Sequence, residues 1–249
     1  MWIKICGNTS LEDAQLAVDA GADALGFVFA LSPRRVTPQQ VAEITRALPR
    51  TVEKIGVFVD AGFDEIVATI LEAGLTGVQL HGDVTAAPDL APSLAPSLAK
   101  RLRQRFANGT PQSVSLGILH VLNCEAEGRE GNDTLQAQLK ALRQNHAVDA
   151  VLVDSRSPHA RGGTGMRFDW QAARRSFSAA APHLRIIVAG GLNPENVREA
   201  IHTLHPWGVD VVTGVEAAPG RKDPARVKEF IAAARAAAES IRHAPAAEA

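Results

Sequence analysis

Residues 3–28 read IKICGNTSLEDAQLAVDAGADALGFV, and this stretch contains the unit that decides the fold. A short apolar run, Ile3–Cys6, is followed by a polar loop, and Ser10 then stands where a hydroxyl can cap the first turn of a helix. An amphipathic stretch leads through Gly21 to a second apolar run, Ala24–Val28. The order of strand, loop, helix and strand predicts a βαβ unit with parallel strands.

The same unit recurs along the whole chain. Six more apolar, β-branched runs lie at Lys54–Val59, Gly77–Leu80, Val114–Val121, Ala150–Val153, Arg185–Ala189 and Val209–Val212. All of these runs are nearly continuous rather than alternating, as is typical of parallel strands buried on both faces. Together with the first two runs they make eight strands alternating with helical patterns. The chain is therefore predicted to be an α/β protein, a single (β/α)8 TIM barrel with a parallel eight-stranded core.

Capping residues mark several of the expected helix starts. Ser10 and Asp13 have the spacing of a capping box. Proline follows a capping side chain at three further starts, Thr37-Pro38, Asn193-Pro194 and Asp223-Pro224. A doubly wound open sheet is the alternative fold, but it rarely needs eight regular units. It would also carry a G-x-G-x-x-G turn after the first strand, and the sequence CGNTS at that place is not one.

Length and composition fit one barrel. The 249 residues match the roughly 250 residues typical of this fold, and 46% hydrophobic and 21% charged residues are ordinary for a globular protein. We expect the barrel domain over residues 1–242 and a frayed tail over residues 243–249. Two stretches, Ala86–Ser97 and Asn123–Asp133, are interpreted as surface insertions around the fourth and fifth helices.

Charge and cysteine content exclude several classes of partner. A formal net charge of −1 without a basic run argues against nucleic-acid and membrane partners, and no apolar stretch is long enough to cross a bilayer. Two cysteines, Cys6 and Cys124, make no disulfide framework, and Cys124 is given no role. The first run begins near Trp2, which leaves no room for a signal peptide. We therefore expect a cytoplasmic protein, and a monomer, because no expected element shows a surplus apolar face.

Two reactive side chains stand at the ends of expected strands, where barrels carry their chemistry. Cys6 ends the first run, and a nearby cation or helix N-terminus could favour its thiolate there, although a lone cysteine is more often simply packed. Asp154 directly follows the sixth run, and a carboxylate in that place is costly to bury unless it is paired or functional. The two residues form a candidate acid/base pair across the barrel mouth.

Glycines at the ends of the seventh and eighth runs predict a phosphate site. Gly190 and Gly191 follow the seventh run, and Thr213 and Gly214 follow the eighth. Glycine lets backbone N–H groups approach an anion, and many such barrels bind phosphate after these two strands. Simple turn glycines are the alternative reading, but two instances at the correct strands favour a small phosphorylated substrate.

Three other features at strand ends are open to a functional reading. A glycine-rich segment after the sixth run is interpreted as a mobile lid. Its members are Gly162, Gly163, Thr164 and Gly165. Arg34, after the second run, offers a planar fork to a carboxylate or phosphate, although a solvated charge is the commoner fate of an arginine. His81 is more readily a hydrogen-bonding structural histidine than a proton shuttle, and with no second ligand at metal spacing no metal is expected.

Taken in order, these motifs resemble the phosphoribosylanthranilate isomerase family. The matching segments are Lys4–Gly7, Gly26–Phe29, Ser32–Arg34, Gly56–Val59, Val78–Gly82, Val153–Ser155, Gly162–Gly165, Phe168–Trp170, Ala189–Asn196, Gly208–Asp210 and Gly214–Glu216. Several are weak individually, but as an ordered set across nearly the whole chain they are specific.

The resemblance implies an Amadori rearrangement in tryptophan biosynthesis without a metal or organic cofactor. N-(5-phosphoribosyl)anthranilate would be opened to the 1-deoxyribulose phosphate by an isomerase of the intramolecular oxidoreductase type. Asp154 matches the family's general acid, which protonates the ring oxygen, and Cys6 matches the general base, which removes the C2′ proton. Arg34 aligns with the arginine that holds the anthranilate carboxylate, and the glycines of the last two strand ends align with the phosphate cradle.

The chain departs from the family pattern at a few positions, and two other functions remain as alternatives. Asn8 stands where a β-branched residue is common, Arg35 where an aromatic residue often follows, and Val212-Thr213 replaces a pair of serines. Another phosphosugar isomerase is disfavoured because the first strand ends in Cys6. A catalytically silent binding barrel is disfavoured because it has no need of Cys6, Asp154 and Arg34 together.

Overall fold

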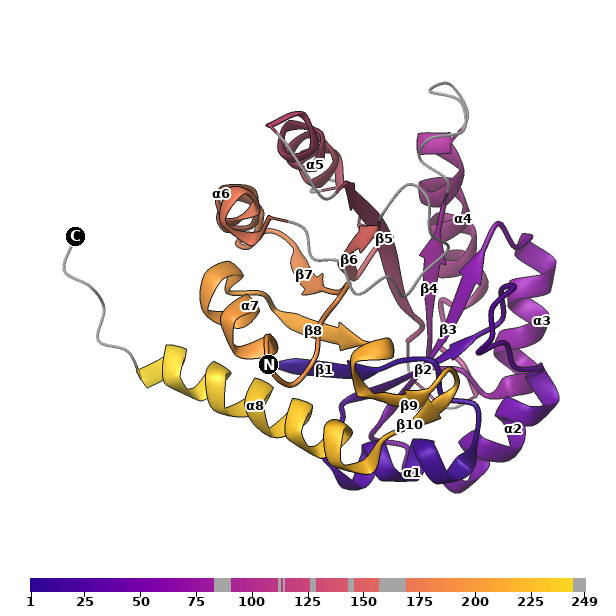
Figure 1. Cartoon of the computed structure of the whole chain (residues 1–249). Coiled ribbons are helices and arrows are strands. Elements are labelled where there is room, and N and C mark those ends of the chain that lie inside the picture. The colour runs from indigo at the N-terminus through magenta and orange to yellow at the C-terminus, as the bar shows by residue number, and fades with distance from the viewer. Residues whose placement is uncertain are drawn as a thin grey trace.

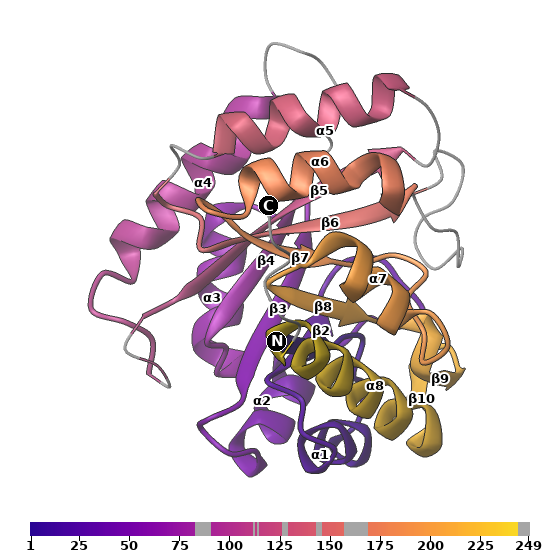
Figure 2. The same cartoon turned by 90° about the vertical axis from the view of Figure 1, so that its left-hand side faces the viewer.

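The protein is described by a computed structural model that covers residues 1–82, 91–111, 113, 115–125, 129–142, 146–156 and 169–243. Eight parallel strands form a closed barrel in the order of the sequence, from β1 to β8, and β1 pairs with β8 to close it. The helices lie around the outside of the strands (Figures 1 and 2). The expected (β/α)8 barrel is confirmed.

Each element has the following bounds. The strands are β1 Trp2–Ile5, β2 Ala24–Val28, β3 Glu53–Val59, β4 Gly77–His81, β5 Gly117–Glu125, β6 Ala150–Arg156, β7 Arg185–Val188 and β8 Gly208–Val211. The helices are α1 Leu11–Asp19, α2 Pro38–Ala47, α3 Phe63–Ala73, α4 Ala91–Arg105, α5 Arg129–Leu142, α6 Trp170–Ala180, α7 Val197–Leu204 and α8 Pro224–His243. A 3-10 turn, η1 Thr213–Val215, and a hairpin of β9 Glu216–Ala218 and β10 Arg221–Lys222 stand between β8 and α8.

Regular elements occupy much of the two stretches that are expected to be surface insertions. Residues 91–97 belong to α4, and β5 runs on to Glu125 while α5 begins at Arg129. At the second stretch, β5 and β6 continue to pair beyond the apolar core, with Asn123 opposite Asp154. Backbone hydrogen bonds hold this extension, so the loss of apolar side chains in the sequence did not mark its end.

The first two helices start as expected, with one difference. The Ser10 hydroxyl accepts the Asp13 N–H at 3.2 Å, but the Asp13 carboxylate accepts the distant Lys222 N–H at 2.9 Å instead of completing a capping box. At α2 the box is complete, because Thr37 and Gln40 each accept the backbone N–H of the other.

The starts of α7 and α8 differ from each other. Asp223 accepts two backbone N–H groups of the first turn of α8, as expected. By contrast, α7 begins at Val197 rather than directly after Asn193-Pro194. The Asn193 side chain still accepts the backbone N–H of Asn196 at 2.9 Å, and the Asn196 side chain accepts the backbone N–H of Asn193 at the same distance. This reciprocal pair rigidifies the loop before the helix.

A small apolar cluster fills the barrel, separate from the larger one between strands and helices. Its members are Trp2, Ala24, Ile55, Leu119, Val121, Ala150, Leu152, Ile187 and Ala189. Side chains alternate between the two faces of a strand. Lys4 and Cys6 therefore share the inward face with Trp2, and Asp154 shares it with Leu152. The sequence thus aims both candidate catalytic residues into the mouth of the barrel.

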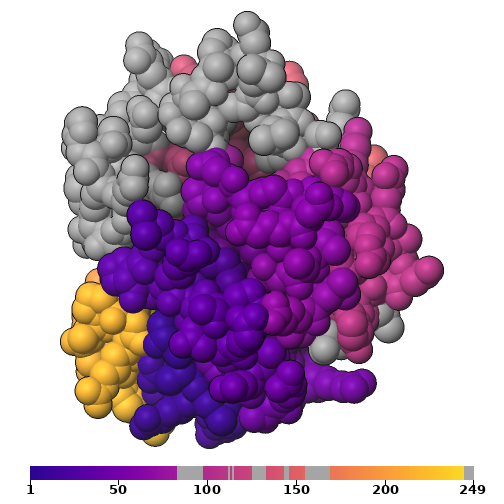
Figure 3. Space-filling view, turned by 90° about the vertical axis from the view of Figure 1, so that its right-hand side faces the viewer, coloured from indigo at the N-terminus to yellow at the C-terminus, as the bar shows by residue number. Residues whose placement is uncertain are grey.

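The outer surface belongs to the helices. Figure 3 shows one side of it, on which residues of the N-terminal half, coloured indigo to magenta, form most of the described surface. None of the described helices is long and apolar enough to cross a membrane. The last helix, α8, continues through His243, one residue beyond the expected end of the barrel domain, and the expected frayed tail otherwise lies outside the described residues.

Candidate active site

Cys6 stands directly after β1 and is held by the strands on both sides. Its N–H donates to the Val211 carbonyl at 2.9 Å, which extends the β1–β8 ladder by one residue. The side chain is only 3% exposed, and a Cβ added to Gly26 would lie 2.4 Å from the Cys6 sulfur. Sequence reasoning gave Gly26 no role of its own, although a glycine inside a strand is the usual signal of such a close approach.

The ionisation of Cys6 is set by opposing effects. Burial raises the pKa of the Cys6 thiol most strongly, the positive charge of Lys4 lowers this pKa, and the Asp210 carboxylate raises it again. Lys222 is a second cation that lowers it. The net shift of the pKa is upward, so the anticipated help from a nearby cation is present but is outweighed by burial.

A buried polar network lies below Cys6 inside the barrel. The fully buried Lys4 donates to Gln79 and to Asp210, both at 2.9 Å. Burial lowers the pKa of Lys4, but the negative charges of Asp210 and Cys6 more than compensate, and the net shift is upward. His81 lies 3.0 Å from Gln79 and is thus joined to this network, in accord with the structural reading of that histidine.

Asp154 lies within β6 rather than directly after it, yet it still stands at the mouth of the barrel. The pairing of β6 with β7 ends where Val153 lies opposite Val188. Asp154 is the next residue; it is half-buried, and β7 no longer pairs with β6 at this position. Cys6 and Asp154 therefore share the inward face at the carboxyl ends of β1 and β6, with β7 and β8 between them.

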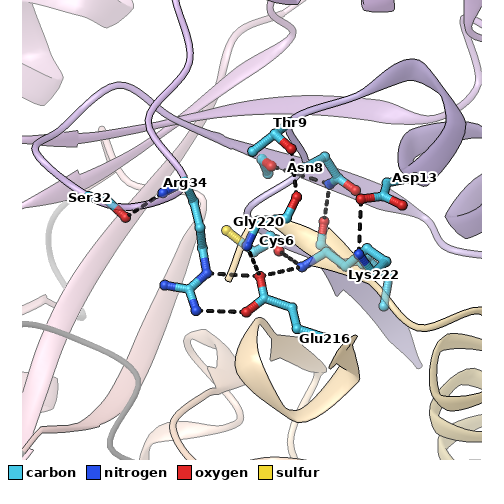
Figure 4. A network of polar contacts seen from close by, with 11 residues as sticks. Cys6, Asn8, Thr9, Asp13, Ser32, Arg34, Glu216, Gly220 and Lys222 are labelled. Atoms are coloured by element: carbon cyan, nitrogen blue, oxygen red, sulfur yellow. Dashed lines mark hydrogen bonds and ion pairs between the residues drawn. The ribbon is translucent and has the colours of Figure 1, made fainter. Parts of the chain in front are cut away.

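Arg34 is held in a two-pronged ion pair that the sequence did not reveal (Figure 4). Its Nε and Nη2 donate to the two carboxylate oxygens of Glu216 at 2.8 and 2.6 Å. Both side chains are largely buried, with 13% of Arg34 and 4% of Glu216 exposed. Arg34 is thus no solvated charge, whereas the neighbouring Arg35 is exposed. In the sequence, Glu216 is only the last residue of a family motif, and no local signal points to this pairing.

The loop after β1 brings Arg34 beside Cys6. Gly7 has a φ of +74°, which favours glycine, and a Cβ on it would lie 2.8 Å from Cδ of Arg34. Both the backbone conformation and the close approach of Arg34 therefore require glycine at this position. Asn8, which departs from the family pattern, is fully buried and donates its side-chain amide to the carbonyls of Ile5 and Gly26. These bonds fix the loop that carries Cys6.

The loops after β7 and β8 pack directly against each other. Gly190 and Gly191 have φ values of +81° and +61°, a conformation that glycine adopts at little cost. A Cβ on Gly214 would lie 1.8 Å from the Leu192 carbonyl oxygen. Thr213 lies beside this contact, half-buried in η1. Gly190 and Gly191 thus have a backbone conformation that favours glycine, and phosphate binding by these loops stays a prediction.

Three other predictions concern the lid, a metal site and Cys124. The expected lid, Gly162–Gly165, lies outside the described residues. Within the described part of the chain, no group of three or more His, Cys, Asp or Glu side chains is placed to hold a metal ion. Cys124 is buried in the outer apolar cluster and lies apart from the inward face.

The Cys6 thiol and the largely buried Arg34–Glu216 ion pair lie in the loops at the carboxyl ends of the strands, where enzymes of this fold bind and convert small molecules. The chain is thus a TIM-barrel enzyme. The sequence model of the N-(5'phosphoribosyl)anthranilate (PRA) isomerase family matches residues 3–114 and 129–233. The chain belongs to this isomerase family.

Relatives and solved structures agree with this assignment. An N-(5'-phosphoribosyl)anthranilate isomerase of Pelobacter propionicus is 43% identical over 234 residues, which are 94% of this chain and 95% of that protein. The phosphoribosyl anthranilate isomerase of Thermotoga maritima has a TM-score of 0.74 and 31% identity, covering 95% of this chain and 99% of that one. A second structure, with a TM-score of 0.71, 30% identity and coverages of 95% and 99%, is a phosphoribosyl anthranilate isomerase in complex with reduced 1-(o-carboxyphenylamino)-1-deoxyribulose 5-phosphate.

Proposed function

We propose that Asp154 and Cys6 are the general acid and general base of the isomerisation for which this family is named. The substrate is N-(5-phosphoribosyl)anthranilate and the product 1-(2-carboxyphenylamino)-1-deoxyribulose 5-phosphate. One observation carries the proposal: both side chains share the inward face of the barrel at the carboxyl ends of their strands. A buried thiol and a half-buried carboxylate at a barrel mouth are suited to exchange protons with one substrate.

Formation of the enolamine needs two proton transfers, and the overall reaction needs no external oxidant or reductant. Asp154 donates a proton to the furanose ring oxygen as the C1′–O bond breaks, and the anilino nitrogen supplies the electron pair that forms an iminium. Cys6 then removes the C2′ proton, and the C–H electrons form the C1′–C2′ double bond of an enolamine while the iminium nitrogen regains its electron pair. The enolamine becomes the ketone when C1′ gains a proton and the 2′-hydroxyl loses one. C1′ is reduced while C2′ is oxidised, which makes the enzyme an intramolecular oxidoreductase of the aldose–ketose type that requires no cofactor.

The two ends of the substrate are anionic, and each would meet its own set of donors. Arg34 would hold the anthranilate carboxylate, because its planar guanidinium matches that group. The phosphate would lie on the loops of Gly190, Gly191, Thr213 and Gly214, whose closely packed backbones can present N–H groups to an anion. The segment Gly162–Gly165 would close over the bound substrate. We expect the enzyme to act as a cytoplasmic monomer without a nucleic-acid or membrane partner.

The experiment follows the loss of anthranilate fluorescence after freshly made phosphoribosylanthranilate is mixed with wild type, Cys6→Ala and Asp154→Ala. Wild type should consume the substrate rapidly, and each variant should lose at least about a hundredfold, the scale of one general acid or base. Cys124→Ala is the matched control, because Cys124 is also buried but faces the helices. Full activity of Cys6→Ala would move the base elsewhere, and an inactive, folded wild type would favour a silent binding barrel.

A further inference from the structure

We propose that Glu216 is a positioning residue for substrate recognition, which holds Arg34 so that the outer edge of its guanidinium faces the anthranilate carboxylate. The inference rests on the proposed role of Arg34. Glu216 itself would not touch the substrate but would act through the arginine, and its contribution would be confined to ligands that carry the ring carboxylate.

The ion pair leaves one edge of the Arg34 guanidinium open. Glu216 accepts hydrogen bonds from Nε and Nη2 of Arg34. These two nitrogens form one of the two edges through which a guanidinium can bind a carboxylate with two hydrogen bonds. Among the described residues, the remaining nitrogen, Nη1, has no hydrogen-bond partner. The second edge, formed by Nη1 and the outer hydrogen of Nη2, is thus left for another carboxylate.

Glu216 is itself held in place by two further contacts. Its carboxylate also accepts the Gly220 N–H at 3.2 Å and faces the ammonium group of Lys222 at 3.3 Å (Figure 4). Burial raises the pKa of Glu216, but Arg34 and Lys222 together lower this pKa by more, so the net shift is downward. The group therefore stays ionised near neutral pH, and a buried, fourfold-bonded carboxylate cannot follow Arg34 if the arginine swings away.

Lys222 links the Glu216 carboxylate to Cys6, the residue proposed as the base. Lys222 also donates to the carbonyl oxygen of Cys6 at 2.6 Å, and its backbone N–H donates to Asp13 at the start of α1. The β9–β10 hairpin thus lies beside the end of β1 (Figure 1). Through Glu216, one rigid hairpin sets the distance between Arg34 and the proposed base, which fixes the anthranilate ring relative to C2′.

The test compares two ligands in wild type and Glu216→Gln by calorimetric titration. One ligand is reduced 1-(o-carboxyphenylamino)-1-deoxyribulose 5-phosphate, and the other is the same molecule without the ring carboxylate. Glu216→Gln should weaken the first by about tenfold, the scale of a lost charged hydrogen bond, and should leave the second within about twofold. In an Arg34→Ala background, Glu216→Gln should have no further effect on either ligand.

Asp23→Asn serves as the matched control at the opposite end of the barrel. Asp23 also pairs with an arginine, Arg235, and also accepts a backbone N–H, that of Ile3. This variant should lose stability without a change in the affinity for either ligand.

Three outcomes separate the possible failures. Equal weakening of both ligands by Glu216→Gln would overturn the proposal in favour of a purely structural role. Tighter binding of the carboxylate ligand would overturn it too, because Glu216 would then be a competitor of the substrate for Arg34. If Arg34→Ala leaves the preference of wild type for the carboxylate ligand intact, the role of Arg34 fails first, whatever Glu216 does.

Discussion

The Cys6 sulfur lies against the Cα of Gly26 on the neighbouring strand, so closely that a Cβ on Gly26 would stand 2.4 Å from it. The same added atom would lie 3.0 Å from the Cys6 Cα, so the whole residue, and not only the thiol, is seated on the glycine. The position of the proposed base thus depends on the absence of a side chain at Gly26 of β2.

Gly26→Ala is expected to lower kcat/KM by at least about tenfold, because a displacement of a reacting group by about 1 Å can cost up to a hundredfold. Steady-state fluorescence kinetics would measure the loss. Gly62→Ala is the control, since a Cβ there meets nothing within 4 Å. Unchanged activity of Gly26→Ala would mean that the sulfur need not stay where the structure has it.

The pH dependence of Cys6 alkylation tests the buried cation beneath it. Burial raises the pKa of Cys6 and Lys4 opposes this, so iodoacetamide should react slowly at neutral pH and faster as the pH rises. Lys4→Met should raise the pKa further and move the rate profile to higher pH. Both proteins would carry Cys124→Ala, so that a single thiol reacts. A profile that stays in place, in a variant with an intact melting transition, would exclude this influence of Lys4.

Arg34→Lys should raise KM by roughly tenfold with little change in kcat, because a lysine keeps the charge but loses the planar fork that binds two carboxylates. Arg35→Lys is the matched control on the adjacent, exposed residue and should leave both constants unchanged. The result would contradict the expectation if kcat fell and KM stayed constant, since that pattern points to a role in the transition state alone.

Gly214→Ala should disrupt the proposed phosphate site. The added Cβ would lie 1.8 Å from the Leu192 carbonyl oxygen, and a backbone atom cannot move aside cheaply, so the loops after β7 and β8 must separate. We expect a lower melting temperature and weaker inhibition by inorganic phosphate. Unchanged inhibition in a destabilised variant would place the phosphate elsewhere.

Glu216 should make part of the stability depend on acid pH. Its pKa is lowered in the folded protein, so between the folded and unfolded pKa values the unfolded chain binds more protons. This contribution is complete above the unfolded pKa and is lost as the pH falls through the folded one. In thermal melts, Glu216→Gln should have a lower melting temperature than wild type at pH 7, but its melting temperature should fall less than that of wild type on acidification. An equal fall in both proteins would contradict the prediction.

The repeated pattern of the sequence was sufficient for the fold because its signals are local. Continuous apolar, β-branched runs between capped helices require strands buried on both faces, and the run Ala24–Val28 matches β2 residue for residue. Carboxyl ends of parallel strands share one face of a barrel, so the positions of Cys6 and Asp154 followed from the strand order alone.

Tertiary structure alone decided how these residues are held. Glu216 and Arg34 are 182 residues apart, Lys4 and Asp210 are 206 apart, and no local pattern can pair them. The extension of β5 and β6 past the core likewise rests on backbone pairing, which leaves no apolar signature. The sequence by itself determined which residues stand at the mouth of the barrel, because periodicity is a property of each strand. Closure of the barrel determined their partners, because only closure brings β8 and its hairpin beside β1.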